Sequence, residues 1–558
     1  MTLTADTLFV NGLIYSVDDD FSTAEAVAVR GAEIVFVGST DGAMRLAGED
    51  TRVVDLEGRT VVPGFTDSHL HPVNAAKNLE VAVQLTGSRS LAEALERIKE
   101  RAAELEPGEW FRGSNHWSID ALEEGRLPYR HELDEVAPDN PFWVNVAFHR
   151  AAANSRALAA AGIDRETPQS FGHGTGWVFK DEHGEPNGHL LESAMFAVIE
   201  QEPLESEEVV LAGIEHVQDL LLENGITSVI DQGDVGPPFR DFPLMQRLWR
   251  ERRLRLRWRM NHIGFEMAPM PVEAISDHVG TLRNVSGFGD DWLRMGAIGE
   301  LVLDGFIEDH WSRAPYAEDE FGHGWCGIRL YSPDTVLAIC RAAAAHGLQM
   351  NVHCAGDGAL DAALEAFEEI DREAPISGLR WSLEHGGMHP SEQNLRQCLD
   401  MGIVVGTQQP LPYWHAKDVI RFYGREAEVW FPNRTWWENG VVLRGGSDFD
   451  SAPLSPLLGI WAIVTRRTIT GDVVAPGQVI PREEALRMYT RNAAWSVFED
   501  DRKGSLQPGK LADLVVLSGD LMAVPDDEIK DLEVVATVVG GKAAYDATGL
   551  LRRIAAAV

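Results

Sequence analysis

Short runs in which apolar and polar residues alternate make up both ends of the chain. Near the N-terminus they read TLFVNGLIYSV, AEAVAVRGAEIVFVGS and RVVDLEGRTVVPG, broken at Asn-Gly, Arg-Gly and Glu-Gly pairs. ADLVVLSGD and VVATVVGGKAAYD repeat the pattern near the C-terminus. A period of two with glycine at the breaks indicates β-hairpins. Because each end is small for a core of its own, we expect both ends to pair as one composite β-sandwich.

The middle of the chain has a different pattern, in which short apolar runs are followed by helical ones. Eight such runs occur in order: VVPGFTDSH, GITSVIDQG, RLRWRMNHIG, MGAIGELVLDG, LQMNVHCAG, RWSLEHGG, GIVVGTQQP and VVLRGGSDF. Helix-like segments such as SPDTVLAICRAAAAHG and SEQNLRQCLDMG lie between several of them. Buried strands alternating with helices indicate a parallel sheet, and eight of them predict a closed barrel.

The first two runs are separated by about 150 residues, far more than one helix needs. We therefore expect an inserted subdomain over residues 85–210, placed to cover the barrel mouth. The predicted fold is α/β: a (β/α)8 TIM barrel with a composite β-sandwich from both termini and a large insertion. The expected domains are 1–62 with 498–558, the barrel 63–497, and the insertion 85–210 within it.

Composition narrows the class of protein and its partners. The chain has 558 residues with 44% hydrophobic and 24% charged residues, which is typical of a globular protein. Its net charge of −38 makes nucleic acid and membrane surfaces poor partners. The four cysteines form no CxxC pair, and no run reaches the ~20 apolar residues of a membrane helix. With no signal-peptide pattern at the N-terminus, we expect a soluble cytoplasmic protein.

Polar residues at the ends of the predicted strands are the candidate metal-binding and catalytic residues. His69 and His71 close the first run, and their i, i+2 spacing directs both imidazoles to one side of a strand. His353, His385 and Asp448 end the fifth, sixth and eighth runs. The C-terminal ends of all strands lie on one face of a parallel barrel, so these five side chains should converge there. The alternative is a set of separate core histidines.

Several segments together resemble the amidohydrolase superfamily of metal-dependent hydrolases, and within it amidohydrolase family 3. They are PGFTDSHLHP, GITSVIDQG, NVHCAGDGALD, LEHGGMHP, GGSDF and PGKLADLVVLSGD. The resemblance covers nearly the whole chain, and the order of the motifs matches. It implies a (β/α)8 barrel, one or two divalent metals that are usually zinc, and hydrolysis of an amide or related bond by metal-activated hydroxide.

The resemblance also assigns roles to the polar residues. His69 and His71 would bind the more buried metal, and His353 and His385 the more exposed one. Asp448 would bind a metal and serve as general base and then general acid. Many family members bridge the metals with a carboxylated lysine, whose place here falls on Glu300 in ELVLDG. We expect Glu300 to be a metal ligand, and the alternative is a buried carboxylate, Glu300 or Asp304, paired with an arginine.

A second group of residues is expected to bind substrate. His116 and Trp117 in SNHWSID, and His149 in AFHRAAANS, resemble stretches that line the pocket in this branch. Gln409 ends the seventh run, while Trp414 and Phe449 lie beside positions of expected ligands. The alternative for each is ordinary core packing.

The leading function is hydrolysis of a non-peptide C–N bond in an amide, formamide or other N-acyl compound that is apolar or aromatic. N-substituted formamide deformylation and N-acyl amino acid hydrolysis are activities of this branch. A heterocycle deaminase is the first alternative, but such relatives place a glutamate three residues after the fifth-strand histidine, where this chain has Gly356 and then Asp357. A non-catalytic scaffold is the second, and the intact ligand set speaks against it. The resemblance also allows a homodimer, although no interface can be located.

Overall fold

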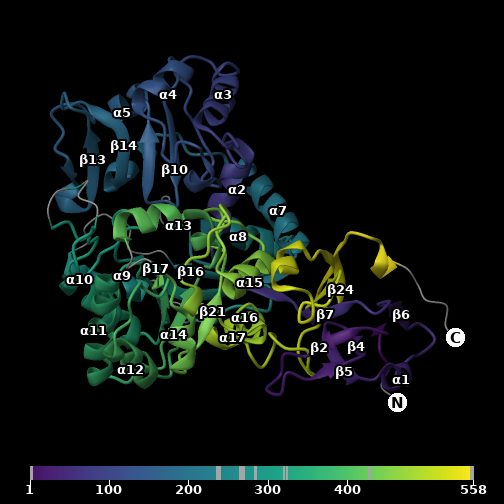
Figure 1. The fold of residues 1–558 in the computed structure, drawn as a ribbon. Coiled ribbons are helices and arrows are strands. Elements are labelled where there is room, and N and C mark those ends of the chain that lie inside the picture. The colour runs from purple at the N-terminus through teal and green to yellow at the C-terminus, as the bar shows by residue number, and fades with distance from the viewer. Residues whose placement is uncertain are drawn as a thin grey trace.

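The computed structural model describes residues 4–233, 241–262, 271–281, 286–317, 321, 324–424 and 429–552. Figure 1 shows three parts: a barrel in the middle, a β-rich part on the right that carries both termini, and an inserted subdomain above the barrel. Within the described residues, no helix combines the length and apolarity needed to cross a bilayer.

Eight parallel strands form the barrel, in the order in which they follow along the chain. They are β8 (Phe65–Leu70), β15 (Ile226–Asp231), β16 (Arg257–His262), β17 (Leu293–Val302), β18 (Met350–His353), β19 (Ser382–Glu384), β20 (Val404–Thr407) and β21 (Leu443–Gly445). The last and first strands meet where Asp448 N–H donates to the His69 carbonyl and His71 N–H donates to the Phe449 carbonyl, both at 2.7 Å. The predicted (β/α)8 fold is thus confirmed.

Helices follow the strands around the outside of the barrel (Figure 1). They are α2 (Pro72–Val81), α7 (Glu207–Glu223), α8 (Asp241–Arg250), α9 (Val272–Thr281), α10 (Pro333–Ala345), α11 (Asp357–Glu373), α12 (Glu392–Met401), α13 (Pro410–Tyr423), α14 (Asn433–Glu438), α15 (Pro456–Thr465), α16 (Arg482–Met488) and α17 (Arg491–Ser496). Ser332, Ser391 and Ser455 cap three of them, each accepting a hydrogen bond from a backbone N–H of the first turn.

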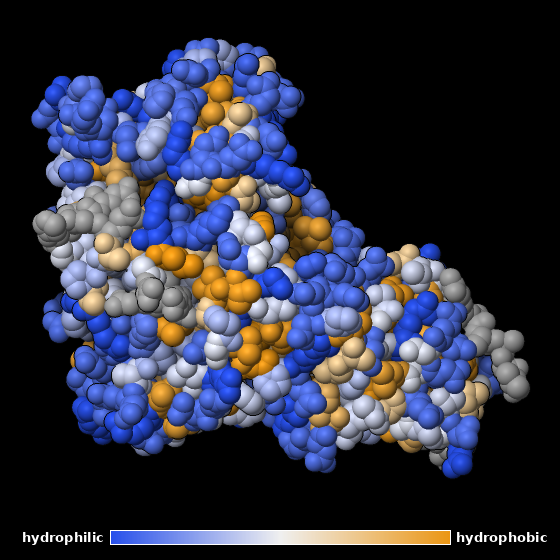
Figure 2. Space-filling view, viewed as in Figure 1, coloured by the Kyte–Doolittle hydropathy of each residue, from blue (hydrophilic) through white to orange (hydrophobic). Residues whose placement is uncertain are grey.

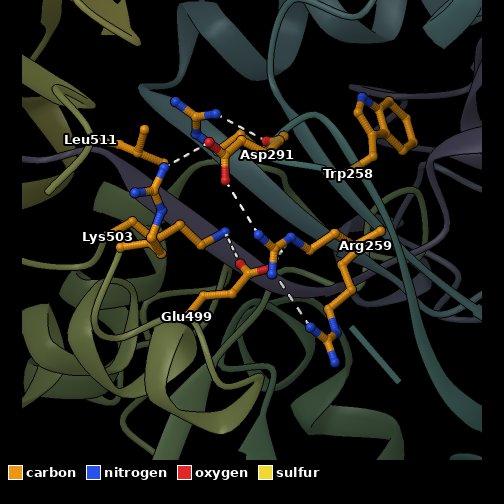
Figure 3. A pocket seen from close by; sticks show the side chains of 9 residues that line it. Trp258, Arg259, Asp291, Glu499, Lys503 and Leu511 are labelled. Atoms are coloured by element: carbon orange, nitrogen blue, oxygen red, sulfur yellow. Dashed lines mark hydrogen bonds and ion pairs between the residues drawn. The ribbon is translucent and has the colours of Figure 1, made fainter. Parts of the chain in front are cut away.

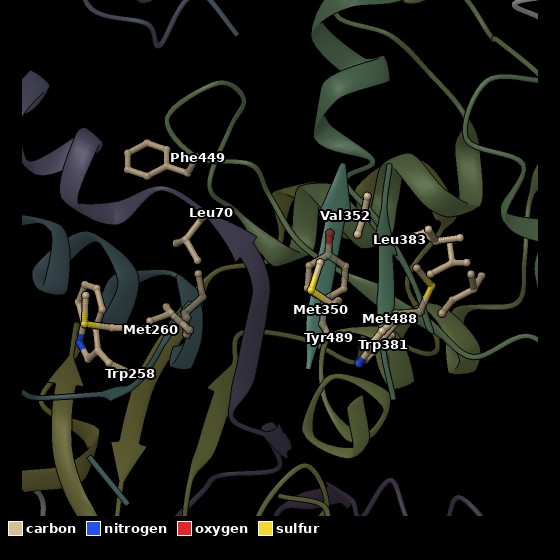
Figure 4. Close-up of a cluster of buried hydrophobic side chains, with 14 of the residues drawn as sticks. Leu70, Trp258, Met260, Met350, Val352, Trp381, Leu383, Phe449, Met488 and Tyr489 are labelled. Atoms are coloured by element: carbon tan, nitrogen blue, oxygen red, sulfur yellow. The ribbon is translucent and has the colours of Figure 1, made fainter. Parts of the chain in front are cut away.

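Large apolar side chains fill the space between the strands and these helices. Trp258, Trp381 and Tyr489 are each at most 2% exposed. Figure 4 shows them among methionine, leucine and valine side chains of the strands and of α16. This core fixes the strands, and so fixes where the polar residues at their ends lie.

Strands from both ends of the chain share one sheet of the β-rich part. Its order is β24 (Lys542–Asp546), β23 (Val534–Val539), β22 (Leu514–Leu517), β7 (Thr60–Pro63), β2 (Leu13–Tyr15) and β3 (Thr23–Ala24). The second sheet is β5 (Glu33–Gly38), β4 (Ala26–Arg30), β1 (Thr7–Val10) and β6 (Arg52–Asp55). Antiparallel pairing of Val62 with Val515 joins the two termini. We propose 1–62 with 498–558, 63–497, and the insertion 85–210 as the domain division.

A buried network of charges lies at the N-terminal end of the barrel, where β16 and β17 begin. Figure 3 shows the small cavity that it lines, with Arg259, Asp291, Glu499 and Lys503 facing one another. Glu499 lies 2.6 Å from the Lys503 ammonium and 3.6 Å from Arg259. Arg257 binds Asp513, just ahead of β22, at 2.6 Å, so the network ties the barrel to the sandwich.

The inserted subdomain has a six-stranded sheet. Its order is β12 (Ser170–Phe171), β13 (Gly176–Lys180), β14 (Pro186–Glu192), β11 (Arg150–Ala153), β10 (Phe142–Val146) and β9 (Phe111–Arg112). The helices α3 (Leu91–Ala102), α4 (Arg130–Val136), α5 (Ser155–Ala160) and α6 (Ser193–Ile199) accompany it.

One hydrophobic cluster joins the insertion to the barrel. It combines insertion residues such as Phe142 and Trp117 with Phe306, Met388 and Trp414, which follow β17, β19 and β20. Figure 2 shows a largely hydrophilic face on which hydrophobic residues gather in the middle of the molecule. The insertion therefore packs on the C-terminal end of the barrel.

Candidate metal centre and active site

Side chains from several barrel strands meet at the C-terminal end of the barrel. The residues that carry them are all buried, none being more than 8% exposed. Three sets of three place their ligand atoms within 4.8 Å of one another: His69, His71 and Glu300; His69, His385 and Asp448; Glu300, His353 and His385. The structure thus brings together the six residues that the sequence singled out as ligands.

Glu300 lies between two pairs of histidines, and each of its carboxylate oxygens faces one pair. Oε2 is 3.5 Å from His69 Nε2 and 3.8 Å from His71 Nε2. Oε1 is 3.1 Å from His353 Nδ1 and 3.3 Å from His385 Nε2. Among the described residues, the ion-pair partners of Glu300 are these histidines, so the arginine pair considered as an alternative does not form.

Asp448 lies on the other side of the first pair. Its Oδ1 is 3.5 Å from His71 Nε2 and 3.8 Å from His69 Nε2. The GGSDF segment holds it there, because a Cβ on Gly446 would come within 2.7 Å of the His69 backbone nitrogen. Only glycine permits this approach, which lets Asp448 N–H reach the His69 carbonyl.

The donor atoms of this cluster fit a divalent ion. His69 Nε2 is buried with no hydrogen-bond partner among the described residues. His385 Nε2 and His353 Nδ1 face each other at 3.0 Å, both beside the same oxygen of Glu300. Imidazole nitrogens and carboxylate oxygens are the ligands of zinc and similar ions. A cation at these atoms would satisfy groups that the protein alone leaves unsatisfied.

Charge within the cluster shifts the pKa values in opposite directions. Burial opposes the charged imidazolium, but the carboxylates of Glu300, Glu384 and Asp448 outweigh it and raise the pKa of His69 to about 9. Burial and the neighbouring His353 lower the pKa of His385 to about 4. Burial opposes ionisation of Glu300, yet the nearby His69 and His353 hold its pKa well below its usual value. The centre therefore presents ionised carboxylate, as a metal site requires.

The outward-facing histidine nitrogens are held by a further set of groups. His69 Nδ1 lies 3.0 Å from Glu384 Oε2, and His71 Nδ1 lies 2.9 Å from the Gly233 carbonyl. Glu384 itself accepts from Arg444 and Ser382. Burial opposes ionisation of Glu384, but Arg444 and His69 lower its pKa to about 2. Such partners fix the tautomer and the orientation of a ligand histidine. The sequence reasoning missed Glu384, although it precedes His385 in LEHGG.

Several residues at this site have positive φ. His385 and Asp448 have φ of 67° and 60°, in the left-handed region that non-glycine residues avoid. Ala147, Phe148 and Glu192 of the insertion share this property, with φ of 52°, 60° and 48°. Such conformations cost on the order of 1–3 kcal/mol each and persist at functional sites.

The expected substrate-binding residues differ in what they contact. His116 packs 4.7 Å from the ring of Trp414 and 5.2 Å from that of Phe449, and burial lowers its pKa to about 4. The His149 ring lies 5.1 Å from that of His353. These contacts place an aromatic wall beside the candidate metal ligands.

Two other members of that group have their polar atoms engaged in the protein. Trp117 is 2% exposed, and its indole N–H donates to the Asn145 carbonyl at 3.0 Å. Gln409 Oε1 accepts from Asn433 Nδ2 at 2.9 Å. The Trp117 contact belongs to the packing within the insertion. The Gln409 contact stabilises the start of the helix α13.

The position expected to serve proton transfer in related deaminases is Gly356 in this chain, and the carboxylate that follows it, Asp357, makes a structural contact. Asp357 Oδ1 accepts from the backbone N–H of Arg313 at 2.8 Å, and Oδ2 lies 3.5 Å from its guanidinium. Asp304 accepts from the backbone N–H groups of Trp311, Ala355 and Gly356. Both carboxylates therefore position loops around the site.

Comparison with known proteins agrees with this geometry. The model of the family described as "Amidohydrolase family" matches residues 52–545. The chain belongs to the amidohydrolase family. It is 30% identical to the N-substituted formamide deformylase of Arthrobacter pascens, over 98% of this chain and 100% of that protein. It is 29% identical to the protein LONG AFTER FAR-RED 3 of Arabidopsis thaliana, over 97% of this chain and 92% of the other.

The solved structures agree with the fold of this amidohydrolase. An uncharacterized metal-dependent hydrolase from Pyrococcus horikoshii OT3 superimposes with a TM-score of 0.70, at 23% identity, over 93% of this chain and 99% of that one. The family resemblance inferred from the motifs is confirmed. The amidohydrolase is an enzyme, a hydrolase of carbon–nitrogen bonds other than peptide bonds.

Proposed function

We propose that this amidohydrolase cleaves the C–N bond of an N-substituted formamide or related N-acyl compound at a centre of two divalent metals. His69 and His71 would hold one ion, His353 and His385 the other, and Glu300 would bridge them. The observation that carries this proposal is the placement of Glu300, whose Oε2 faces the first histidine pair and whose Oε1 faces the second. This carboxylate takes the place of the carboxylated lysine that the family resemblance leads one to expect.

Bound divalent ions lower the pKa of water and polarise a carbonyl group. The protein supplies the proton transfers through Asp448, whose Oδ1 lies beside His71. This oxygen would accept a proton from the attacking water and return it to the leaving nitrogen as the C–N bond breaks. The water oxygen would bond to the acyl carbon before the C–N bond breaks, and the products are a carboxylic acid, which then ionises, and an amine.

The substrate class is proposed on two grounds. The chain matches the full length of a relative named N-substituted formamide deformylase. In addition, His116, Trp414 and Phe449 form an aromatic group next to Asp448, which suits an aromatic substituent on nitrogen.

Zinc is the proposed metal, because imidazole and carboxylate ligands at tetrahedral or five-coordinate sites suit it. The cytoplasm is the proposed compartment. All four cysteines are free and three are buried, which accords with a reducing environment.

The test is hydrolysis of a panel that pairs formamides with N-acetyl compounds of the same amine, with N-benzylformamide as the first aromatic member. We expect zinc-loaded protein to release amine and formate. This activity should be lost on treatment with a chelator and should return when zinc is added. Absence of turnover on every member of the panel by fully loaded protein would reject the proposed function.

A further inference from the structure

A continuous series of rings runs from Asp448 to the second histidine pair. Each ring centroid lies 4.7–6.2 Å from the next, in the order Phe449, His116, Trp414, His415, Phe306 and His385. Asp448 directly precedes Phe449 in the chain. The series therefore begins at the proposed proton-transfer group and ends at a candidate metal ligand, with Phe306 as the ring that contacts this ligand.

Phe306 is enclosed by other rings in addition to His385 and His415. Its ring lies 5.9 Å from that of His149, which belongs to the insertion, and 5.3 Å from that of His310. Trp430 lies 5.8 Å away, and Phe306 is only 2% exposed. Side chains in such close-packed surroundings keep one position, so the Phe306 ring cannot turn away without displacing its neighbours.

The loop that carries Phe306 is also fixed by hydrogen bonds. Ile307 N–H donates to His310 Nε2 at 3.2 Å, which closes the chain just after Phe306. The hydroxyl groups of Tyr316 and Tyr423 donate to the His310 carbonyl at 2.5 Å and 3.1 Å. All of these residues are buried. The backbone therefore holds Phe306 at a set distance from the candidate metal centre.

The proposed function gives the direction in which a substrate would lie along the rings. The leaving nitrogen has to lie beside Asp448 to receive its proton, so its substituent would extend along Phe449 and His116. The acyl carbon would lie between the two histidine pairs. The group that this carbon carries points away from the nitrogen, and so toward His385 and Phe306.

We propose that Phe306 is the specificity-determining residue for the acyl group, admitting the hydrogen of a formyl group and excluding the methyl of an acetyl group or anything larger. This inference rests on the proposed function and narrows its substrate class. A methyl group at this place would have to displace a ring that is packed on several sides, and such overpacking is unfavourable. The preferred substrates are then formamides, whose variable part is the substituent on nitrogen.

The test compares kcat/KM for N-benzylformamide and N-benzylacetamide in zinc-loaded wild type and variants. The wild type should favour the formamide. Phe306→Ala should lower the formamide-to-acetamide ratio at least about tenfold, the scale that one methyl group carries in a pocket, and Phe306→Leu should lower it less. Because both values come from one sample, the ratio does not depend on zinc occupancy or on the folded fraction. Comparing the ratio between variants also cancels the intrinsic difference in reactivity of the two amides.

Two controls separate a role at the acyl group from a general loosening of the protein. Phe367→Ala is the matched variant, because Phe367 is 0% exposed but packs 4.9 Å from Trp381 in the barrel core. Its formamide-to-acetamide ratio should stay within about twofold of the wild type. N-phenethylformamide lengthens the substituent on nitrogen, and its kcat/KM relative to N-benzylformamide should be unchanged in Phe306→Ala.

A lowered formamide-to-acetamide ratio in the two Phe306 variants, without a change in Phe367→Ala, supports the proposal. Ratios within about twofold of the wild type in both Phe306 variants, or an equal change in Phe367→Ala, overturn it. A wild type that cleaves the acetamide as readily as the formamide also overturns it. Each of these results leaves the proposed function intact, whereas a wild type that hydrolyses no member of the amide panel overturns both.

Discussion

The barrel carries a buried cluster of charged groups at each end, and the two clusters are completed in different ways. At the N-terminal end, Glu499 has Lys503 at 2.6 Å and Arg259 at 3.6 Å, and Arg257 binds Asp513. At the C-terminal end, Glu300 and Asp448 face histidines, and His69 Nε2 finds no hydrogen-bond partner among the described residues. The first cluster is satisfied by the protein and stabilises the joint with the sandwich. The second leaves buried groups unsatisfied that could hold a metal ion.

Breaking the N-terminal network should have the largest effect on stability. Glu499→Gln removes the carboxylate that faces Lys503, Arg259 and Arg294, and should lower the free energy of unfolding by about 3–5 kcal/mol. Denaturant unfolding measures this change. Zinc content should stay at the wild-type value, and a parallel loss of zinc would show that the two clusters are not independent.

Glu373→Gln is the matched control for that experiment. Glu373 lies 2.6 Å from Arg341, but the two side chains are 47% and 46% exposed. Its loss should cost at most about 1 kcal/mol, the range of surface ion pairs.

Acid should act on stability through the same carboxylate. Burial opposes ionisation of Glu499, but Lys503 and Arg259 lower its pKa to about 2. The folded-state pKa lies below the unfolded value of about 4.5, so this stabilisation is present above pH 4.5 and is lost as the pH falls toward 2. On the order of 3 kcal/mol should disappear over that window. The stability difference between wild type and Glu499→Gln should shrink in step, and a constant difference would contradict the assignment.

Changing Asp448 should affect chemistry and leave folding unchanged. Asp448→Asn keeps the shape and removes the proton acceptor, so turnover should fall at least about 100-fold while metal stays bound. That loss corresponds to about 2.7 kcal/mol. Steady-state kinetics with elemental analysis of the same sample measures both quantities. Undiminished turnover would remove Asp448 from its proposed role.

Changing Glu384 should weaken the metal site by a smaller amount. Glu384→Gln leaves His69 without its carboxylate partner, and zinc affinity should fall about 10–100-fold, measured by competition with a chelator of known affinity. Because Arg444 would then lack its own partner, the double variant Glu384→Gln/Arg444→Gln checks that lost folding is not the cause. Wild-type affinity in both variants would refute the positioning role.

The barrel and the convergence of the candidate ligands could be predicted from the sequence because their signals are local. Each strand is one short apolar run, and the polar residue at its end marks the face on which it lies. His353 and Asp448 could be placed together because the carboxyl ends of parallel strands share one edge. Glu300 could be identified only through the resemblance, from its spacing to an Asp-Gly pair.

The supporting residues could not be predicted, because their partners are distant in sequence or lack a local signal. Glu384 contacts Arg444 and His69 only in the folded barrel, because both residues are distant from it in sequence. The turn that carries His149 has positive φ at Ala147 and Phe148, and these positions have no glycine that would predict such a turn. Trp117 was expected in the pocket by resemblance, whereas its indole N–H is used within the insertion.

The most direct test of the metal centre is the zinc content of wild-type protein purified without chelator, measured per chain by elemental analysis before and after incubation with zinc. Glu300 facing two histidine pairs predicts two equivalents per chain, falling in the His71→Ala variant. One equivalent would remove the bridging role of Glu300, and none after incubation would contradict the metal centre itself.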